Sequence, residues 1–149
     1  MWLLLVCCLA VTLTAQAATG RVIKVLPEYL DLKGRNMTYP TLYDRDAYQV
    51  TLRRHPEQRS GLRFYVQWKT KGTVAGPIKI RIELKGIMQG NQPKQLVLES
   101  TGSPGGWFSH WTNFTLSGND YKNFGEVTAW RATLWEGDQL LGEQKSFLW

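Results

Sequence analysis

Apolar and charged residues alternate without a break in Pro77-Ile78-Lys79-Ile80-Arg81-Ile82-Glu83-Leu84-Lys85. Successive side chains of a β-strand point to opposite faces, so three isoleucines and a leucine share one face and four charges share the other. The proline stands at the start of the run, where its missing N–H removes no interior hydrogen bond of a sheet. The stretch predicts a strand with one face in a core and the other in water.

The same alternation recurs upstream in Leu62-Arg63-Phe64-Tyr65-Val66-Gln67-Trp68-Lys69. Its core-facing residues are expected to be Leu62, Phe64, Val66 and Trp68. Further strands are predicted at 21–26 (ended by Pro27), 94–99, 107–116, and 127–136 paired with 140–148 through a hairpin connection at 137–139. About seven such strands predict an all-β fold, an antiparallel two-sheet sandwich of immunoglobulin-like architecture. The Cys…Trp…Cys signature of true immunoglobulin domains is absent, so the likeness concerns the architecture only.

The segment 41–54 departs from this alternation of apolar and polar residues and predicts a short helical insertion. Thr41 can cap the helix, and Pro56 prevents its continuation. Charged residues complement the helix dipole in the first turn and in the last: Asp44 and Asp46, then Arg53, Arg54 and His55. The expected apolar stripe consists of Tyr43, Ala47, Tyr48 and Leu52. A strand is the alternative, because apolar residues also alternate at Tyr48, Val50 and Leu52.

The first 17 residues predict a secretory signal peptide. An apolar run over residues 2–13 precedes the A-x-A pattern that ends at Ala17. The run is too short for a membrane-spanning helix, which needs about 20 apolar residues. Cleavage would leave residues 18–149 as one exported β-sandwich domain, periplasmic or extracellular, with no integral membrane span. The chain's two cysteines would be lost with the signal, which excludes disulfides and thiol chemistry: Cys7 and Cys8.

The exported domain is basic. Lys and Arg number 18 against 12 Asp and Glu, giving a formal net charge of +6, and no charged side chain precedes Arg21. Such a balance suits contact with acidic polymers or an anionic cell surface. The basic residues are dispersed without a run of five like charges, so we expect no nucleic-acid partner.

Residues that could support catalysis are scarce. The two histidines are His55 and His110, and a zinc site without cysteine would need both. Ser109 and His110 are neighbours in a predicted strand, so they point to opposite faces and cannot readily pair. No nucleophile elbow, phosphate-binding loop or zinc-protease motif is present. The sequence predicts a non-catalytic protein without cofactor or metal.

One segment rich in aromatic residues favours a binding surface. It reads Gly106-Trp107-Phe108-Ser109-His110-Trp111-Thr112-Asn113-Phe114. In a strand, one face would carry Trp107, Ser109, Trp111 and Asn113. Indole rings can stack on the C–H surface of sugars while hydroxyl and amide groups bind sugar hydroxyls. The alternative is that the two indoles line the interior of the sandwich.

Two short segments of this chain resemble small exported bacterial proteins that have no assigned activity. They are Leu30-Asp31-Leu32-Lys33-Gly34-Arg35 and Lys145-Ser146-Phe147-Leu148-Trp149. The resemblance implies a bacterial envelope setting and supplies no functional residue. We therefore expect a binding domain with a protein or glycan partner of the envelope. In the first hypothesis a protein contacts the excursion 31–60, because long excursions between strands often carry function. The alternative is a carbohydrate-binding module that uses Trp107 and Trp111.

Overall fold

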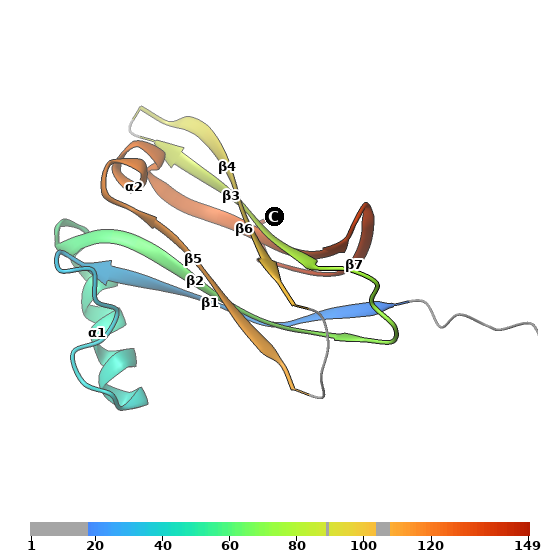
Figure 1. Ribbon diagram of the computed structural model, residues 1–149. Helices are drawn as coiled ribbons and strands as arrows, with labels where there is room; N and C mark the ends of the chain where they lie inside the picture. Colours follow the sequence, from blue (N-terminus) through green and yellow to red (C-terminus); the bar gives the residue numbers. More distant parts are fainter. Residues whose placement is uncertain (1–17, 89, 104–107) are drawn as a thin grey trace, which may run out of the picture.

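The computed structural model describes residues 18–88, 90–103 and 108–149, and the predicted signal peptide lies outside this part. Two antiparallel sheets face one another (Figure 1), which confirms the predicted two-sheet architecture. The three-stranded sheet has the order β1-β2-β5, with bounds β1 (Thr19–Asp31), β2 (Arg59–Lys71) and β5 (His110–Ser117). The four-stranded sheet has the order β4-β3-β6-β7, with bounds β4 (Gln92–Gly102), β3 (Ile78–Met88), β6 (Glu126–Glu136) and β7 (Gln139–Lys145).

The immunoglobulin-like topology is not confirmed. In constant-type immunoglobulin domains the fourth strand belongs to the same sheet as the first, second and fifth. Here β4 pairs along its whole length with β3 and so belongs to the other sheet.

The core lies between the two sheets and confirms the faces predicted for β2 and β3. Their inward side chains are at most 4% exposed: Leu62, Phe64, Val66, Trp68, Ile78, Ile80, Ile82 and Leu84. The same cluster includes buried residues of β1, β5, α2 and β6: Val22, Val25, Phe114, Leu116, Phe124, Ala132 and Leu134. Each large apolar side chain buried in this way contributes about 1.5–3 kcal/mol relative to exposure.

Some strands begin or end at other residues than predicted, either at a sheet edge or at a turn. β1 continues through Pro27, which lies opposite Phe64, because β1 is an edge strand and a proline can direct its missing N–H to the free side. β4 extends beyond both ends of the predicted 94–99. The hairpin turn between β6 and β7 is shorter than predicted, since Glu136 already pairs with Gln139.

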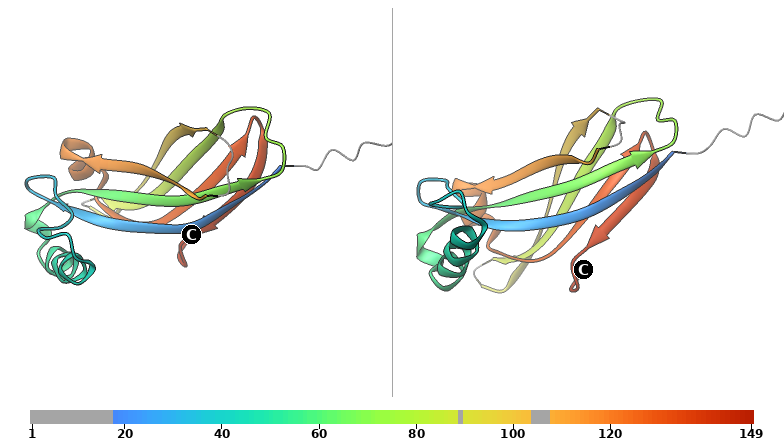
Figure 2. Two further views of the ribbon diagram at one scale, coloured as in Figure 1. Left: turned by 60° about the horizontal axis from the view of Figure 1, so that its bottom comes forward. Right: turned by 90° about the horizontal axis from the view of Figure 1, so that it is seen from below.

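Two glycines bring the sheets together along one side of the sandwich. A Cβ placed on Gly142 of β7 would lie 2.4 Å from the Gly20 carbonyl oxygen of β1. The backbones therefore approach where any larger residue would force them apart. Figure 2 shows the start of β1 beside the β6–β7 hairpin at this end of the molecule.

The predicted helical insertion is present as α1 (Leu42–Arg54), followed by the 3-10 turn η1 (Pro56–Gln58). Thr41 is its N-cap, as predicted, and its Oγ1 accepts a hydrogen bond of 3.2 Å from the Asp44 amide. A second helix, α2 (Gly118–Phe124), connects β5 to β6. None of the described helices has the length and apolar character needed to cross a membrane.

The apolar stripe predicted for α1 is wrong in part. Tyr43 is 82% exposed and Ala47 is exposed, whereas Gln49 is buried beside Leu52. Gln49 Oε1 accepts from the Tyr29 amide at 2.7 Å, and its Nε2 donates to the Tyr29 carbonyl at 2.9 Å. The helix thus presents an amide to the free edge of β1 and satisfies both backbone groups there, which an apolar side chain could not do.

Candidate functional site

The outer face of the three-stranded sheet carries the described residues of the predicted aromatic surface. Pairing of β5 with β2 places Trp111 opposite Gln67 and Asn113 opposite Tyr65. Trp111 is 50% exposed and Asn113 is exposed, so Trp111 does not line the interior. The other predicted indole, Trp107, lies outside the described residues.

Side-chain contacts fix β5 to β2 on both faces around Trp111. On the outer face, Gln67 Nε2 donates to Ser109 Oγ at 2.8 Å. On the inner face, the Trp68 indole N–H donates to Thr112 Oγ1 at 2.9 Å, and the Trp68 ring stacks on His110 with centroids 4.8 Å apart. We use the name aromatic platform for the outer set Tyr65, Gln67, Ser109, Trp111 and Asn113.

Sequence reasoning missed the part of this face that β1 and β2 supply. The alternation of β2 predicted that Tyr65 and Gln67 point outward, yet nothing local indicated that they lie beside Trp111. Lys24 of β1 lies opposite Gln67, so it continues the row across the sheet. The identity of these neighbours depends on strand register, which the sequence pattern does not specify.

Cations occupy one end of the same face. Arg21 of β1 lies directly opposite Lys69 of β2, and Thr19 lies opposite Lys71. A hollow of about 240 Å³ lies there, lined by Thr19, Gly20, Arg21, Lys69 and Lys71. We use the name basic end for Arg21, Lys24, Lys69 and Lys71, of which Arg21, Lys24 and Lys71 are exposed.

The excursion 31–60 is anchored by a buried carboxylate at its start. Asp31 Oδ1 accepts from the Lys33 and Arg35 amides, both at 2.8 Å, and Asp31 Oδ2 accepts from the Tyr48 hydroxyl at 2.8 Å. Arg35 Nη2 lies 2.9 Å from Oδ2. Burial alone would raise the pKa of Asp31, but these hydrogen bonds to its charged form lower the pKa to about 2.

Acid is expected to destabilise the protein through Asp31. Because its pKa falls from 3.8 to about 2 on folding, the stabilisation is complete above pH 4 and is lost as the pH drops toward 2. Urea unfolding followed by circular dichroism across this range should therefore show a flatter profile for Asp31→Asn. The exposed Asp46→Asn is the matched control, and a profile equally steep in Asp31→Asn and the unaltered protein would contradict the assignment.

An exposed apolar cluster lies at the start of α1. Tyr39, Leu42 and Tyr43 are 66%, 69% and 82% exposed. Exposed apolar groups gathered in this way often mark a protein interface, where tyrosine is enriched. These residues lie within the excursion 31–60, which the first hypothesis assigned to a protein partner.

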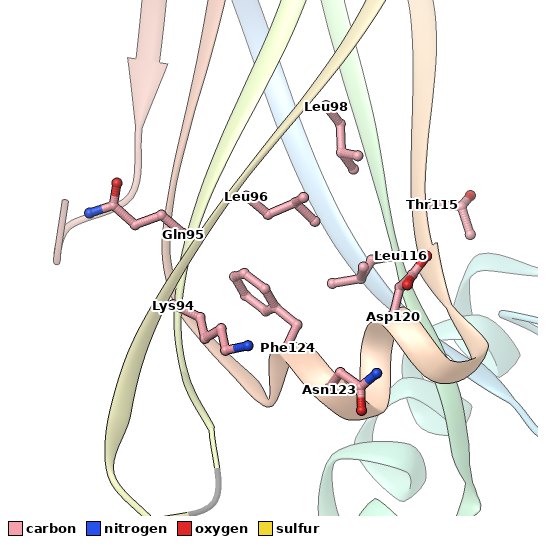
Figure 3. Close-up of a pocket in the computed structure, with 9 residues that line it drawn as sticks. All are labelled: Lys94, Gln95, Leu96, Leu98, Thr115, Leu116, Asp120, Asn123 and Phe124. Atoms are coloured by element: carbon pink, nitrogen blue, oxygen red, sulfur yellow. The ribbon is translucent and has the colours of Figure 1, made fainter.

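A slot opens between the edge strands β4 and β5. Its volume is about 290 Å³, and Figure 3 shows Leu96 and Leu98 of β4 directed toward Leu116 of β5 and Phe124 of α2. Lys94 and Asn123 also line the slot. Its walls are mainly apolar, so the slot is a space beside the core with few side chains for catalysis or polar binding.

The contacts of the two histidines indicate a structural role for both. The His110 ring is stacked on Trp68, and His55 Nδ1 lies 3.1 Å from Glu57 Oε1 at the surface. Within the described residues, no three His, Cys, Asp or Glu side chains gather in a group that could hold a metal ion.

Fold and face together define a two-sheet antiparallel β protein with an aromatic and basic outer surface. The chain matches no protein-family model, no curated protein and no solved structure. Its resemblance to small exported bacterial proteins therefore stays a prediction.

Proposed function

We propose that this protein is an exported, non-catalytic domain that binds carbohydrate of the cell envelope, in the periplasm or outside the cell. The observation that carries the proposal is the half-exposed indole of Trp111, held on a sheet face among hydrogen-bonding side chains. An exposed indole offers a large apolar surface for stacking on a sugar ring. Gln67, Ser109 and Asn113 lie on the same face, where amides and hydroxyls can bind sugar hydroxyls.

Rigid placement of the platform supports this function. Gln67 and Ser109 hold one another on the outer face, while Trp68 and Thr112 join the same two strands on the inner face. A binding surface built on paired strands loses little conformational freedom when a ligand binds.

Trp111→Ala is expected to weaken glycan binding about 30-fold, which corresponds to the roughly 2 kcal/mol of an interface hot spot. The measurement is binding of the exported, purified protein to a broad glycan panel, followed by titration calorimetry with the best ligand. Trp135→Ala is the control, because it removes an indole from the outer face of the four-stranded sheet. Equal affinity of Trp111→Ala and the unaltered protein would refute the platform.

A protein partner at α1 is the second candidate function, supported by the exposed Tyr39, Leu42 and Tyr43. The same variants separate the two candidates. An envelope protein that is retained by Trp111→Ala and lost by Tyr43→Ser would assign binding to α1. Loss in Trp111→Ala alone would assign it to the sheet.

A further inference from the structure

The basic end brings like charges together on strands that supply no carboxylate. Arg21 and Lys69 are direct partners in the β1–β2 ladder. No Asp or Glu occurs in the three strand segments that build this half of the sheet, 19–26, 65–71 and 110–113. Like charges directly opposite one another on neighbouring strands destabilise a sheet. This half of the sheet therefore retains a repulsion that its own strands do not relieve.

Two arginines on the outer face of the other sheet are paired with carboxylates. Arg81 Nε lies 2.7 Å from Glu99 Oε1 on the neighbouring strand. Arg131 Nε lies 2.5 Å from Glu83 Oε2, again across a strand pair. The four-stranded sheet thus supplies a carboxylate to each of these two arginines, whereas the strand segments that build the basic end supply none. This contrast favours an external anion as the partner of the basic end.

The basic end is continuous with the aromatic platform. Lys24, Gln67 and Trp111 form one row across three strands, and neighbouring strands lie about 4.8 Å apart. Lys69 follows Gln67 by two positions and therefore shares its face. Arg21 lies beyond it, at the 240 Å³ hollow. A chain-like ligand stacked on Trp111 can therefore extend over the cations.

We propose that the ligand of this face is an acidic polysaccharide that bears uronate, sulfate or phosphate groups. One of its sugars stacks on Trp111, and its anionic groups bind Arg21, Lys24 and Lys69. The inference rests on the proposed function, because it names the ligand class of the same face. A guanidinium matches carboxylate, sulfate and phosphate oxygens in a bidentate manner, and lysine adds a point charge.

The test compares acidic glycans with their neutral parents. The exported, purified protein is titrated with polymers bearing uronate, sulfate or phosphate, with the uncharged parent of each, and with single-stranded DNA. Binding is expected for the acidic glycans and is expected to weaken as salt rises, since salt screens exposed charges beyond about 8 Å at physiological ionic strength. Arg21→Gln/Lys69→Gln should weaken this binding about tenfold. The control Lys79→Gln/Lys145→Gln removes two charges from the other sheet and should leave it unchanged.

The outcomes separate this inference from the proposed function. Equal binding of acidic and neutral glycans, unchanged in Arg21→Gln/Lys69→Gln, would overturn the acidic ligand and leave carbohydrate binding in place. If no glycan binds, both the acidic ligand and the carbohydrate-binding function are overturned. Tighter binding to DNA than to any glycan would also overturn both and would indicate a nucleic-acid partner.

A stability measurement tests the same charges without a ligand. Lys69→Glu places a carboxylate opposite Arg21, so the midpoint of thermal unfolding is expected to rise while acidic-glycan binding is lost. A lowered midpoint would show that the two cations do not repel one another across the ladder, and the charge argument would fail.

Discussion

Trp68→Ala is expected to lower the free energy of unfolding by about 4 kcal/mol, the largest effect of any single substitution considered for this protein. The side chain is 1% exposed, and its ring reaches from β2 to the opposite sheet. A Cβ placed on Gly102 of β4 would lie 2.6 Å from Trp68 Cζ2, so no larger residue fits there. Truncation would leave a cavity in the core and also remove the hydrogen bond to Thr112.

Urea unfolding followed by far-ultraviolet circular dichroism measures this loss without relying on tryptophan fluorescence. Trp111→Ala is the matched control, because it truncates the same side chain on the neighbouring strand, where half of it is already exposed. We expect that variant to lose about 1 kcal/mol or less. Equal losses in the two variants would contradict the faces assigned to β2 and β5.

Arg59→Ala is expected to cost about 3 kcal/mol, because its guanidinium joins α1 to both sheets. Nε and Nη2 each donate at 2.5 Å to the Leu52 and Arg53 carbonyls, which are unpaired acceptors at the end of the helix. Nη1 lies 3.3 Å from Glu126 Oε2 of β6. The Arg59 side chain is 5% exposed, so its removal leaves the buried Leu52 carbonyl without this donor and opens the contact between α1 and the sheets.

Tyr29 completes this cluster. The Arg59 guanidinium carbon lies 4.0 Å from the centre of its ring, and its hydroxyl donates to Glu126 Oε1 at 2.9 Å. Burial and the Glu126 carboxylate raise the pKa of Tyr29 to about 12, so the phenol remains a hydrogen-bond donor at neutral pH.

Hydrogen exchange of the α1 amides, measured with urea unfolding, tests the role of Arg59. In Arg59→Ala these amides should lose protection earlier than those of β3. Arg63→Ala is the control, because Arg63 lies on the same strand and donates from the surface to Thr115 Oγ1 at 3.1 Å. If Arg63→Ala costs as much as Arg59→Ala, the link between the helix and the sheets is not what stabilises the fold.

Local patterns predicted much of the fold. The period of two in β2 and β3 predicted which side chains face the core, because the direction of a strand side chain depends on its own position alone. The Thr41 cap likewise predicted where α1 begins, since a cap involves residues within one turn. These properties depend on neighbours in sequence and need no knowledge of the rest of the chain.

The buried face of α1 and most of the candidate site could not be predicted in this way. Gln49 is buried because a free strand edge offers it both a donor and an acceptor, and that edge belongs to Tyr29, 20 residues earlier. Trp111 was recognised from its own segment, but Gln67 lies 44 residues from it and Lys24 still further.

The sequence by itself determined a mostly β chain, the inward faces of β2 and β3, the helix after Thr41 and an aromatic segment suited to binding. Tertiary structure alone decided that Arg21 meets Lys69 and that their charges lie on the same sheet face as Trp111. The physical reason is the geometry of the sheet. Side-chain direction is a local property of the strand, whereas cross-strand neighbours follow from the register and order in which distant strands pair.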